Sequence, residues 1–400
     1  MTLLDLIPIW AALTASLLTA ACLWGAIRLR ILYSLWDPCS AALFQVTFTF
    51  WVLVLIRLLP IGDAIGFILF FVTLAAGRDK RGKPGKPLIT NEEWVRFSYV
   101  LISILLVLNV YLIKQKGFLL LSDDIGMARG EFYQNWGVFK RLNESGVGVI
   151  GISGFFLWSR GKRALATLYF FFAAFLMLTL GSRASLLVFL FLYGAYARYV
   201  VRSVRSGVLV LIGFVLSLSS LGFFYIMYGT QFLVMFGARV VAYCDGPVYF
   251  FVGNLTRKLF YGPGYAFDQI LIDLRLRDHP AYLSLGQALD WSFLHYSNPL
   301  TGPNPQFCVE AHVMFGWAFL IWYAFVAFTF VYLRKKMSTP FSFYAISMIV
   351  GPLLMDSQFA GSQVFSASLI LGLLFLVRYL RRLLVLATER ARAARSLVIE

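Results

Sequence analysis

The sequence predicts an all-α polytopic integral membrane protein with about eleven transmembrane helices. Hydrophobic residues make up 60% of the 400-residue chain and charged residues 14%, and the mean hydropathy is +0.78. These values are typical of a chain whose solvent is mostly lipid. The net charge of +16 is gathered in short segments between apolar runs, so it indicates membrane topology and no nucleic-acid partner.

A transmembrane helix needs roughly 20 apolar residues, or somewhat fewer if flanking residues snorkel. Runs that meet this requirement lie near 4–27, 40–59, 62–77, 95–113, 143–159, 164–181, 184–200, 207–228, 306–333, 341–359 and 363–380. The first run has neither a basic segment ahead of it nor a small-residue cleavage site behind it, so we expect it to be retained. We therefore divide the chain into an N-terminal helix bundle (1–228), a loop (229–305), C-terminal helices (306–380) and a basic tail (381–400).

Basic clusters follow every odd-numbered run, beginning with Arg28 and Arg30 and ending with the arginines of the tail. Short loops rich in Lys and Arg stay in the cytoplasm. The N-terminus is therefore predicted outside and the C-terminus inside, with outer loops at 114–143 and 229–305. If the runs near 40–59 and 62–77 form one interrupted or re-entrant unit, the N-terminal end has the opposite orientation. We expect the tail to lie along the inner surface as an amphipathic helix.

The loop 229–305 is the longest polar interruption in the chain, and we expect it to be partly helical. All three histidines lie in it or just after it: His279, His295 and His312. Acidic and basic residues are mixed along it, so it is close to neutral and its charges are expected to pair with each other or with substrate. Its tyrosines and Trp291 suit stacking against sugar rings, and some of them also suit the headgroup level of a membrane.

The segment Gly181-Ser182-Arg183 lies at the outer junction of two runs. Gly181 ends one helix, Ser182 caps the next and Arg183 falls in its first turn. A helix N-terminus beside an arginine suits a phosphate or pyrophosphate. An interfacial arginine that snorkels to the headgroups is an equally good interpretation.

The run near 306–333 is predicted to begin with Asn304 as cap and Pro305 in the first turn, so that another helix N-terminus points outward. Glu310 and His312 follow within two turns, but they point about 200° apart and cannot form a simple pair. Charged residues near span ends, here also Glu144 and Asp356, are functional candidates, with a satisfied polar partner in the bundle as the alternative.

No metal site and no cofactor are predicted. Cys308 with His312 supplies only two ligands, and the spacing of the four cysteines matches no zinc motif. Cys244 and Cys308 fall on the same predicted side of the membrane. Two buried thiols are the favoured interpretation and a disulfide is the alternative.

The topology, together with Gly181-Ser182-Arg183 and the segment from Gly302 to Gly316, resembles the Wzy-type O-antigen polymerases. The resemblance implies a glycosyltransferase of the GT-C type in the bacterial inner membrane. Such enzymes transfer a growing glycan from undecaprenyl pyrophosphate to the non-reducing end of a lipid-linked repeat unit at the periplasmic face. The implied partners are undecaprenyl-pyrophosphate-linked oligosaccharides, membrane lipids and a chain-length regulator.

Under this resemblance the outer arginines bind the donor pyrophosphate. We expect Arg183 and Arg239 to hold it, with Arg257, Arg275 or Arg277 adding to the clamp, and charge stabilisation on the leaving group to be the main catalytic contribution. Glu310, His312 or His295 is the expected base for the attacking hydroxyl.

Two other functions stay open at this point. An O-antigen ligase, which transfers the glycan to lipid A core, would share the outer loop, the arginines and a histidine. A lipid-linked oligosaccharide transporter belongs to a different class and would place charges in mid-membrane. Arg57 is the main charge well inside an apolar run, and no internal repeat is visible, so a transporter is less favoured.

Overall fold

The computed structural model describes residues 6–29, 31–32, 40–77, 89–117, 132–133, 136–179, 218, 222, 225, 229–231, 241–277, 280–294, 303, 305–335 and 340–399. Within these ranges all regular secondary structure is helical. The predicted all-α class is therefore confirmed for this part of the chain.

The predicted apolar runs within the described residues are helical, and the run near 306–333 is divided into two helices. The helices are α2 (Ile9–Arg28), α3 (Ser40–Leu55), α4 (Ile61–Ala76), α5 (Asn91–Lys116), α7 (Gly137–Ser159), α8 (Arg163–Thr179), α15 (Gln306–Phe315), α16 (Leu320–Lys335), α17 (Pro340–Met355) and α18 (Ser357–Ile399). The runs near 184–200 and 207–228 lie almost entirely outside the described residues. The helix α7 begins at Gly137, within the segment 114–143 predicted as the first outer loop.

Two helices in the described part of the chain are long and apolar enough to cross a membrane, Ile9–Arg28 and Glu92–Lys116. This is consistent with association with a membrane. The helices α3, α4, α16 and α17 have 16 residues each, or about 24 Å at 1.5 Å per residue. That is less than the ~30 Å hydrocarbon core, so the number of crossings stays a prediction.

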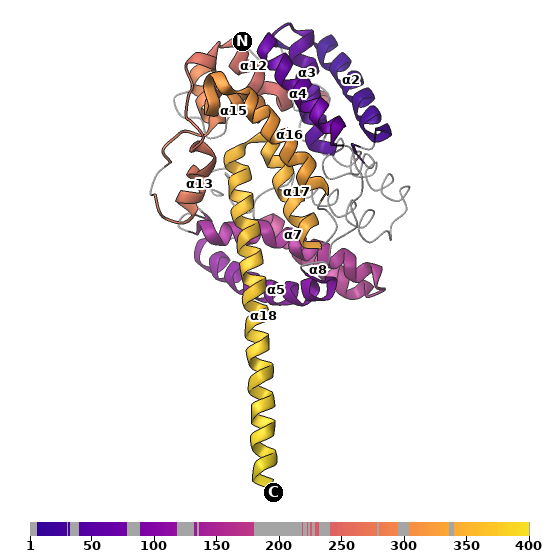
Figure 1. The fold of residues 1–400 in the computed structure, drawn as a ribbon, viewed down its shortest axis with the longest axis vertical. Coiled ribbons are helices and arrows are strands. Elements are labelled where there is room, and N and C mark those ends of the chain that lie inside the picture. The colour runs from indigo at the N-terminus through magenta and orange to yellow at the C-terminus, as the bar shows by residue number, and fades with distance from the viewer. Residues whose placement is uncertain are drawn as a thin grey trace.

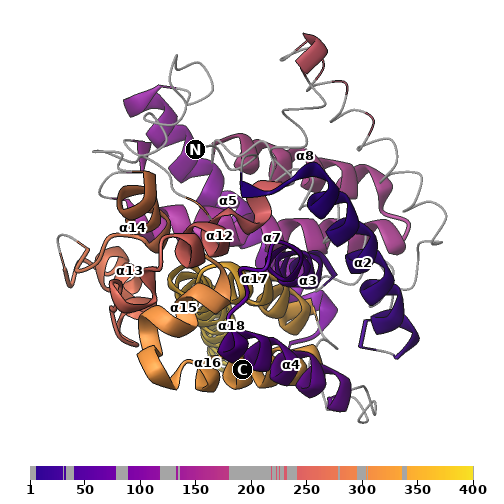
Figure 2. The ribbon, with the colours of Figure 1, turned by 90° about the horizontal axis from the view of Figure 1, so that it is seen from above.

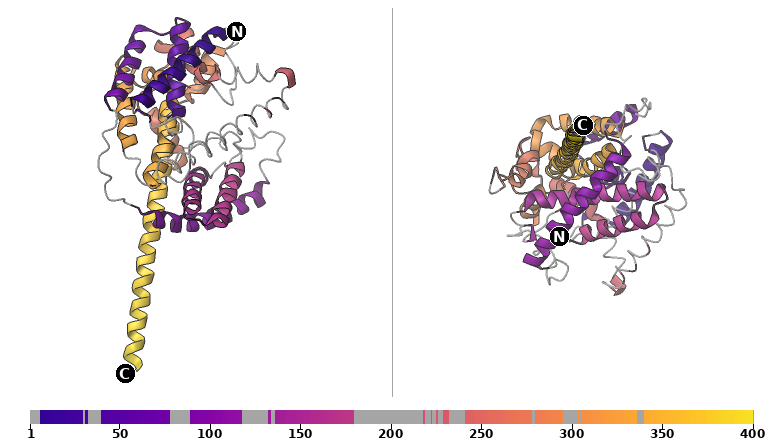
Figure 3. Two further views of the ribbon diagram at one scale, coloured as in Figure 1. Left: turned by 90° about the vertical axis from the view of Figure 1, so that its right-hand side faces the viewer. Right: turned by 90° about the horizontal axis from the view of Figure 1, so that it is seen from below.

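The helices form two layers that share α17 and α18 (Figures 1 and 3). One hydrophobic core joins α3, α4, α15 and α16 with the first turn of α18, and a second joins α5, α7 and α8 with later residues of α18. The layer of α5, α7 and α8 lies across the axis of α18 (Figure 1). Gly148 lets α7 approach α17 closely, since a Cβ at this position would lie 2.6 Å from the Tyr344 ring.

The predicted continuous span over 306–333 is wrong, because α15 and α16 form a helical hairpin. In one straight helix Phe307 and Tyr323 would be about 24 Å apart, whereas their ring centroids are 5.0 Å apart. The turn is at Gly316, whose φ of 54° suits glycine. It is followed by the 3-10 turn η6 (Gly316–Ala318). Because α15 runs back along α16, its first residues are buried against the first turn of α16.

The helix α18 extends without a break from Ser357 to Ile399, over 43 residues. It leaves the bundle and continues along the same axis (Figure 1). The tail is therefore helical, as expected, but it continues α18 and is not a separate helix; its position on the inner surface stays a prediction. The sequence contains no proline from 357 onward, and the segment after 380 is rich in Leu, Ala and Arg, which are strong helix formers.

The loop 229–305 is partly helical, as predicted. Its elements are η2 (Gly229–Gln231), η3 (Ala242–Cys244), α12 (Asp245–Val252), η4 (Leu255–Arg257), α13 (Tyr265–Asp273), α14 (Leu285–Leu289) and η5 (Asp290–Leu294). Viewed from above, α12 to α15 gather on one side of the α17–α18 axis (Figure 2). The loop is tied to the hairpin because the amides of Tyr261 and Gly262 both donate to the carbonyl oxygen of Val313 (2.9 and 3.2 Å).

Candidate functional site

Polar side chains near the turn of the α15–α16 hairpin form a group that we call the Asp63 cluster, made of Asp63, His312 and Tyr323. His312 Nε2 lies 3.0 Å from each carboxylate oxygen of Asp63, and the Tyr323 hydroxyl donates to Asp63 Oδ1 at 2.9 Å. The three residues come from α4, α15 and α16. In the predicted topology, Asp63 and His312 both lie near the outer ends of their helices.

Two glycines bring Asp63 into this cluster. Gly62 and Gly66 flank it with the Gly-x-x-x-Gly spacing that permits close helix packing in membranes. A Cβ at Gly62 would lie 2.8 Å from the Phe319 ring, and a Cβ at Gly66 would lie 2.9 Å from the Tyr323 ring. The start of α4 therefore lies directly against α16, with Asp63 between the two contacts and only 1% exposed.

Aromatic rings surround the imidazole of His312. The Phe319 ring stacks on it with a centroid distance of 4.3 Å, and Phe250 and Phe251 of α12 approach at 5.7 and 6.2 Å. The side chain keeps 11% of its surface exposed. Its Nδ1 has no hydrogen-bond partner among the described residues. His312 is thus a fixed, partly accessible imidazole beneath the outer loop.

Glu310 faces a different element from His312, which confirms that the two cannot form a pair. It is fully buried, and its Oε1 accepts a hydrogen bond from the backbone amide of Ser357, the first residue of α18. A carboxylate at a helix N-terminus satisfies a free amide and interacts favourably with the helix dipole. Glu310 therefore caps the N-terminus of α18, and its complete burial keeps it from a substrate in this conformation.

The prediction of an outward-facing helix N-terminus near 306 is wrong. Gln306 and the next two residues are fully buried, and the Gln306 side chain donates to Thr49 Oγ1 of α3 at 2.7 Å. The reason is the hairpin, which directs the start of α15 into the core. Gln306 also has a φ of 58°, a conformation in which a long side chain is uncommon. Asn304, the expected cap, lies outside the described residues.

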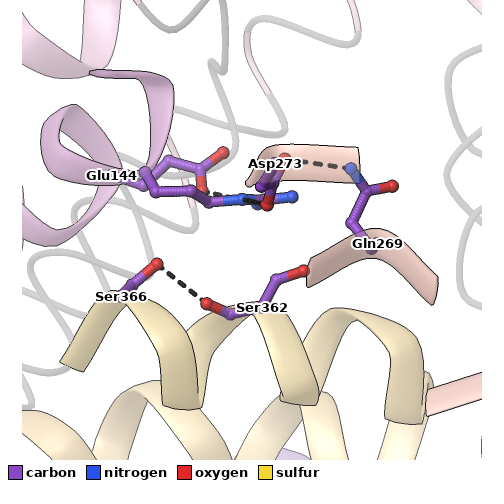
Figure 4. Close-up of polar contacts among 6 residues, drawn as sticks. Glu144, Gln269, Asp273, Ser362 and Ser366 are labelled. Carbon is purple, nitrogen blue, oxygen red and sulfur yellow. Dashed lines mark hydrogen bonds and ion pairs between the residues drawn. The ribbon is translucent and has the colours of Figure 1, made fainter. Parts of the chain in front are cut away.

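A second group, the Arg141 cluster, joins the outer loop to the helices (Figure 4). Arg141 of α7 donates through Nε to Asp273 Oδ2 (2.8 Å) and through Nη1 to Glu144 Oε2 (2.9 Å). Gln269 donates to the other oxygen of Asp273 at 3.1 Å. Arg141 and Asp273 side chains are each 6% exposed. Glu144 therefore has a structural partner, which is the alternative considered for it from the sequence.

Ser362 and Ser366 of α18 lie beside the Arg141 cluster in Figure 4. Ser366 Oγ donates to the carbonyl oxygen of Ser362 at 2.9 Å. The face of α18 at this level is lined with small residues, and a Cβ at Gly361 would lie only 2.4 Å from the carbonyl oxygen of Ala266 in α13. The Arg141 cluster thus fixes α13 against α7 where α13 also packs on α18.

The arginines predicted to bind pyrophosphate differ in their surroundings. Arg257 and Arg275 are exposed on the outer loop. Arg277 forms an ion pair with the buried Asp268, which also accepts from the amide of Ala281 (3.0 Å), so Arg277 stabilises its own loop.

Three of the predicted site residues, Arg183, Arg239 and His295, lie outside the described residues. Their predicted roles stay predictions. Asp356, between α17 and α18, is half-buried.

Cys244 and Cys308 are free buried thiols, as favoured from the sequence. Within the described ranges no group of three or more His, Cys, Asp or Glu side chains is arranged to hold a metal ion.

Sequence reasoning did not identify five residues of these clusters: Asp63, Tyr323, Arg141, Gln269 and Asp273. A usable signal existed for Asp63, an acidic residue inside a Gly-x-x-x-Gly segment at the start of an apolar run. An acidic side chain there is costly unless a partner faces it. Its partner could not be identified, because His312 is 249 residues away along the chain.

Comparison of the chain with protein-family models, with curated proteins and with solved structures finds no match. The function therefore has to be argued from the residues of this chain.

Proposed function

We propose that the protein is a lipid-linked glycan polymerase of the O-antigen type. It would transfer a growing glycan from undecaprenyl pyrophosphate to the non-reducing end of a lipid-linked repeat unit, at the outer face of the bacterial inner membrane. The proposal joins the resemblance at Gly181-Ser182-Arg183 and at Gly302 to Gly316 with the chemistry of the Asp63 cluster.

The observation that carries the proposal is the setting of His312. Among Glu310, His312 and His295, it is the described candidate base that combines a fixed orientation with a partly exposed side chain, since Glu310 is fully buried. A positioned base contributes roughly 10²–10⁴-fold to a transfer reaction. Its place beside α12 puts it under the outer loop, where a lipid-linked sugar would arrive in the predicted topology.

The arginines of the outer face supply the second requirement, which is stabilisation of the leaving group. Arg257 and Arg275 are exposed on the loop, and Arg183 and Arg239 are assigned to the same side from the sequence. Guanidinium groups suit a pyrophosphate because they donate in a planar fork. Arg277 contributes less directly in this proposal, because it pairs with Asp268.

The proposed reaction exchanges one C–O bond for another. The acceptor hydroxyl loses its proton to His312 while its oxygen bonds to the anomeric carbon of the donor glycan. The bond from that carbon to the pyrophosphate oxygen breaks, and undecaprenyl pyrophosphate leaves with the bonding electron pair. The arginines stabilise the negative charge that develops on it.

Deletion of the gene and complementation test the proposal through the lipopolysaccharide ladder on a gel. Wild type should restore a full ladder to a deletion strain that shows core plus one repeat unit. Arg183→Ala and His312→Ala should leave the single unit while the protein stays in the membrane fraction. Arg96→Ala is the matched control, because Arg96 forms an exposed pair with Glu92 (3.9 Å) and should restore the ladder.

Three outcomes contradict parts of this proposal. Loss of every O-antigen band on deletion would indicate a ligase or a transporter. Full ladders from Arg183→Ala would remove that residue from the pyrophosphate site. A full ladder from His312→Ala would remove the base.

A further inference from the structure

We infer that Asp63 is a positioning residue that orients His312 for catalysis, with Tyr323 fixing the carboxylate. This inference rests on the proposed function, since it assigns a role within the same site. The sequence gives Asp63 no such role, because the contact joins the first turn of α4 to the second half of α15.

The hydrogen-bond geometry selects one tautomer of His312. Nε2 lies 3.0 Å from both oxygens of Asp63, and an ionised carboxylate only accepts hydrogen bonds. Nε2 therefore carries the proton and donates it to Asp63. The lone pair is then on Nδ1, the nitrogen without a partner among the described residues, so Nδ1 is the atom that accepts a proton from substrate.

The carboxylate itself is held in place. Asp63 is 1% exposed, and the Tyr323 hydroxyl donates to its Oδ1 at 2.9 Å. The packing of Gly62 on Phe319 and of Gly66 on Tyr323 leaves the backbone on both sides of Asp63 little room to move. A buried carboxylate also favours the imidazolium that forms once Nδ1 has taken a proton.

The imidazole ring has one orientation available to it. Phe319 stacks on one face at 4.3 Å with an interplanar angle of 21°, and Phe250 tilts toward the ring at 5.7 Å. A flip of the ring would exchange Nε2 for a carbon and leave the buried carboxylate of Asp63 with one partner fewer. Unpaired buried carboxylates are costly, so Asp63 selects the ring orientation as well as the tautomer.

Purified full-length protein in lipid nanodiscs tests this inference. The substrate is the lipid-linked repeat unit isolated from the deletion strain, and kcat and KM are measured for polymer formation. Asp63→Asn should lower kcat by at least about 10-fold, the lower end of the effect seen when the carboxylate partner of a functional histidine is lost, with KM within about twofold. Tyr323→Phe should lower kcat by a smaller factor. Glu92→Gln, an exposed change on α5, is the control.

Chemical rescue separates orientation from a merely structural role. His312→Ala should regain part of its rate when free imidazole is added, because the aromatic pocket and Asp63 remain. The double variant His312→Ala/Asp63→Asn should not. If Asp63→Asn does not fold, Asp63→Glu keeps the charge but displaces the carboxylate by one methylene and should also lose kcat with little change in KM.

An Asp63→Asn enzyme with kcat within twofold of wild type would overturn the inference, as would equal imidazole rescue with and without Asp63. If wild type forms no polymer while the control variant is equally inactive, the proposed function itself fails. These two failures are therefore distinguishable.

Discussion

Gly361 of α18 touches the backbone of α13, and replacing it with alanine should force the two helices apart. An added Cβ would lie 2.4 Å from the carbonyl oxygen of Ala266 and 3.5 Å from Ile270 Cδ1. Carbon and carbonyl oxygen normally approach no closer than about 3.3 Å. A backbone carbonyl cannot rotate away as a side chain can, so α13 has to shift by about 1 Å.

The magnitude follows from two opposing effects. Inserting a methyl group into a closely packed contact costs about 1–3 kcal/mol. Alanine in place of glycine within a helix returns up to about 1 kcal/mol. Gly372 lies in the same helix with no atom within 4 Å of an added Cβ, so Gly372→Ala gains the propensity without the clash. The two variants should differ by about 1–3 kcal/mol in the free energy of unfolding.

Unfolding of both variants in the same detergent provides the measurement. Gly361→Ala should unfold at a lower temperature or denaturant concentration than wild type, and Gly372→Ala at the same or a higher one. Equal stabilities for the two variants would refute the close approach of α13 to α18. The same result would also weaken the placement of the Arg141 cluster, because Gln269 and Asp273 are carried by α13.

Two further predictions concern the outer loop. Asp273→Ala should lower the free energy of unfolding by about 1.5–3 kcal/mol, since it removes a hydrogen bond to a charged and buried group. The control Glu92→Ala, at an exposed ion pair, should lower it by at most about 1 kcal/mol. Equal effects of the two variants would show that Arg141 is not held by Asp273. Burial, followed by the nearby carboxylates of Asp356 and Glu310, raises the pKa of Tyr265. The folded state therefore retains a proton that the unfolded state releases above about pH 10. The free energy of unfolding should therefore fall as pH rises past that value. In Tyr265→Phe it should fall less steeply at alkaline pH, although the variant also loses the acceptor of the Leu285 amide, 3.0 Å from the Tyr265 hydroxyl. The same alkaline pH dependence in wild type and Tyr265→Phe would contradict the burial of Tyr265.

Local patterns were sufficient for much of the fold. Apolar runs predicted the helices that the structure describes, and polar composition predicted a partly helical loop at 229–305. The helical pitch alone separated Glu310 from His312. These features depend on residues close together in the chain, whose spacing fixes the outcome.

The features that sequence reasoning did not predict depend on long-range contacts. The run near 306–333 is long enough to span a membrane, and a single glycine within it is tolerated in a straight helix, so Gly316 gave no sufficient reason to expect a hairpin. The partner of Asp63 is set by the packing of α4 on α16. Arg141 and Asp273 meet across 132 residues of chain, and neither residue has a neighbour in sequence that predicts the other.

The α15–α16 hairpin has a consequence for how the orientation of this protein is measured. In the predicted topology the chain enters the bundle near Pro305, returns to the outer side at Gly316 and then crosses once through α16. A straight span also crosses once, so reporter fusions placed after residue 335 give the same sidedness for both arrangements. Backbone that is not helical at this depth must be shielded by protein, as the burial of Pro305 and Gln306 shows. Single cysteines scanned through this segment are thus the informative labels, since a hairpin shields them from water-soluble reagents and a straight span presents them at the surface.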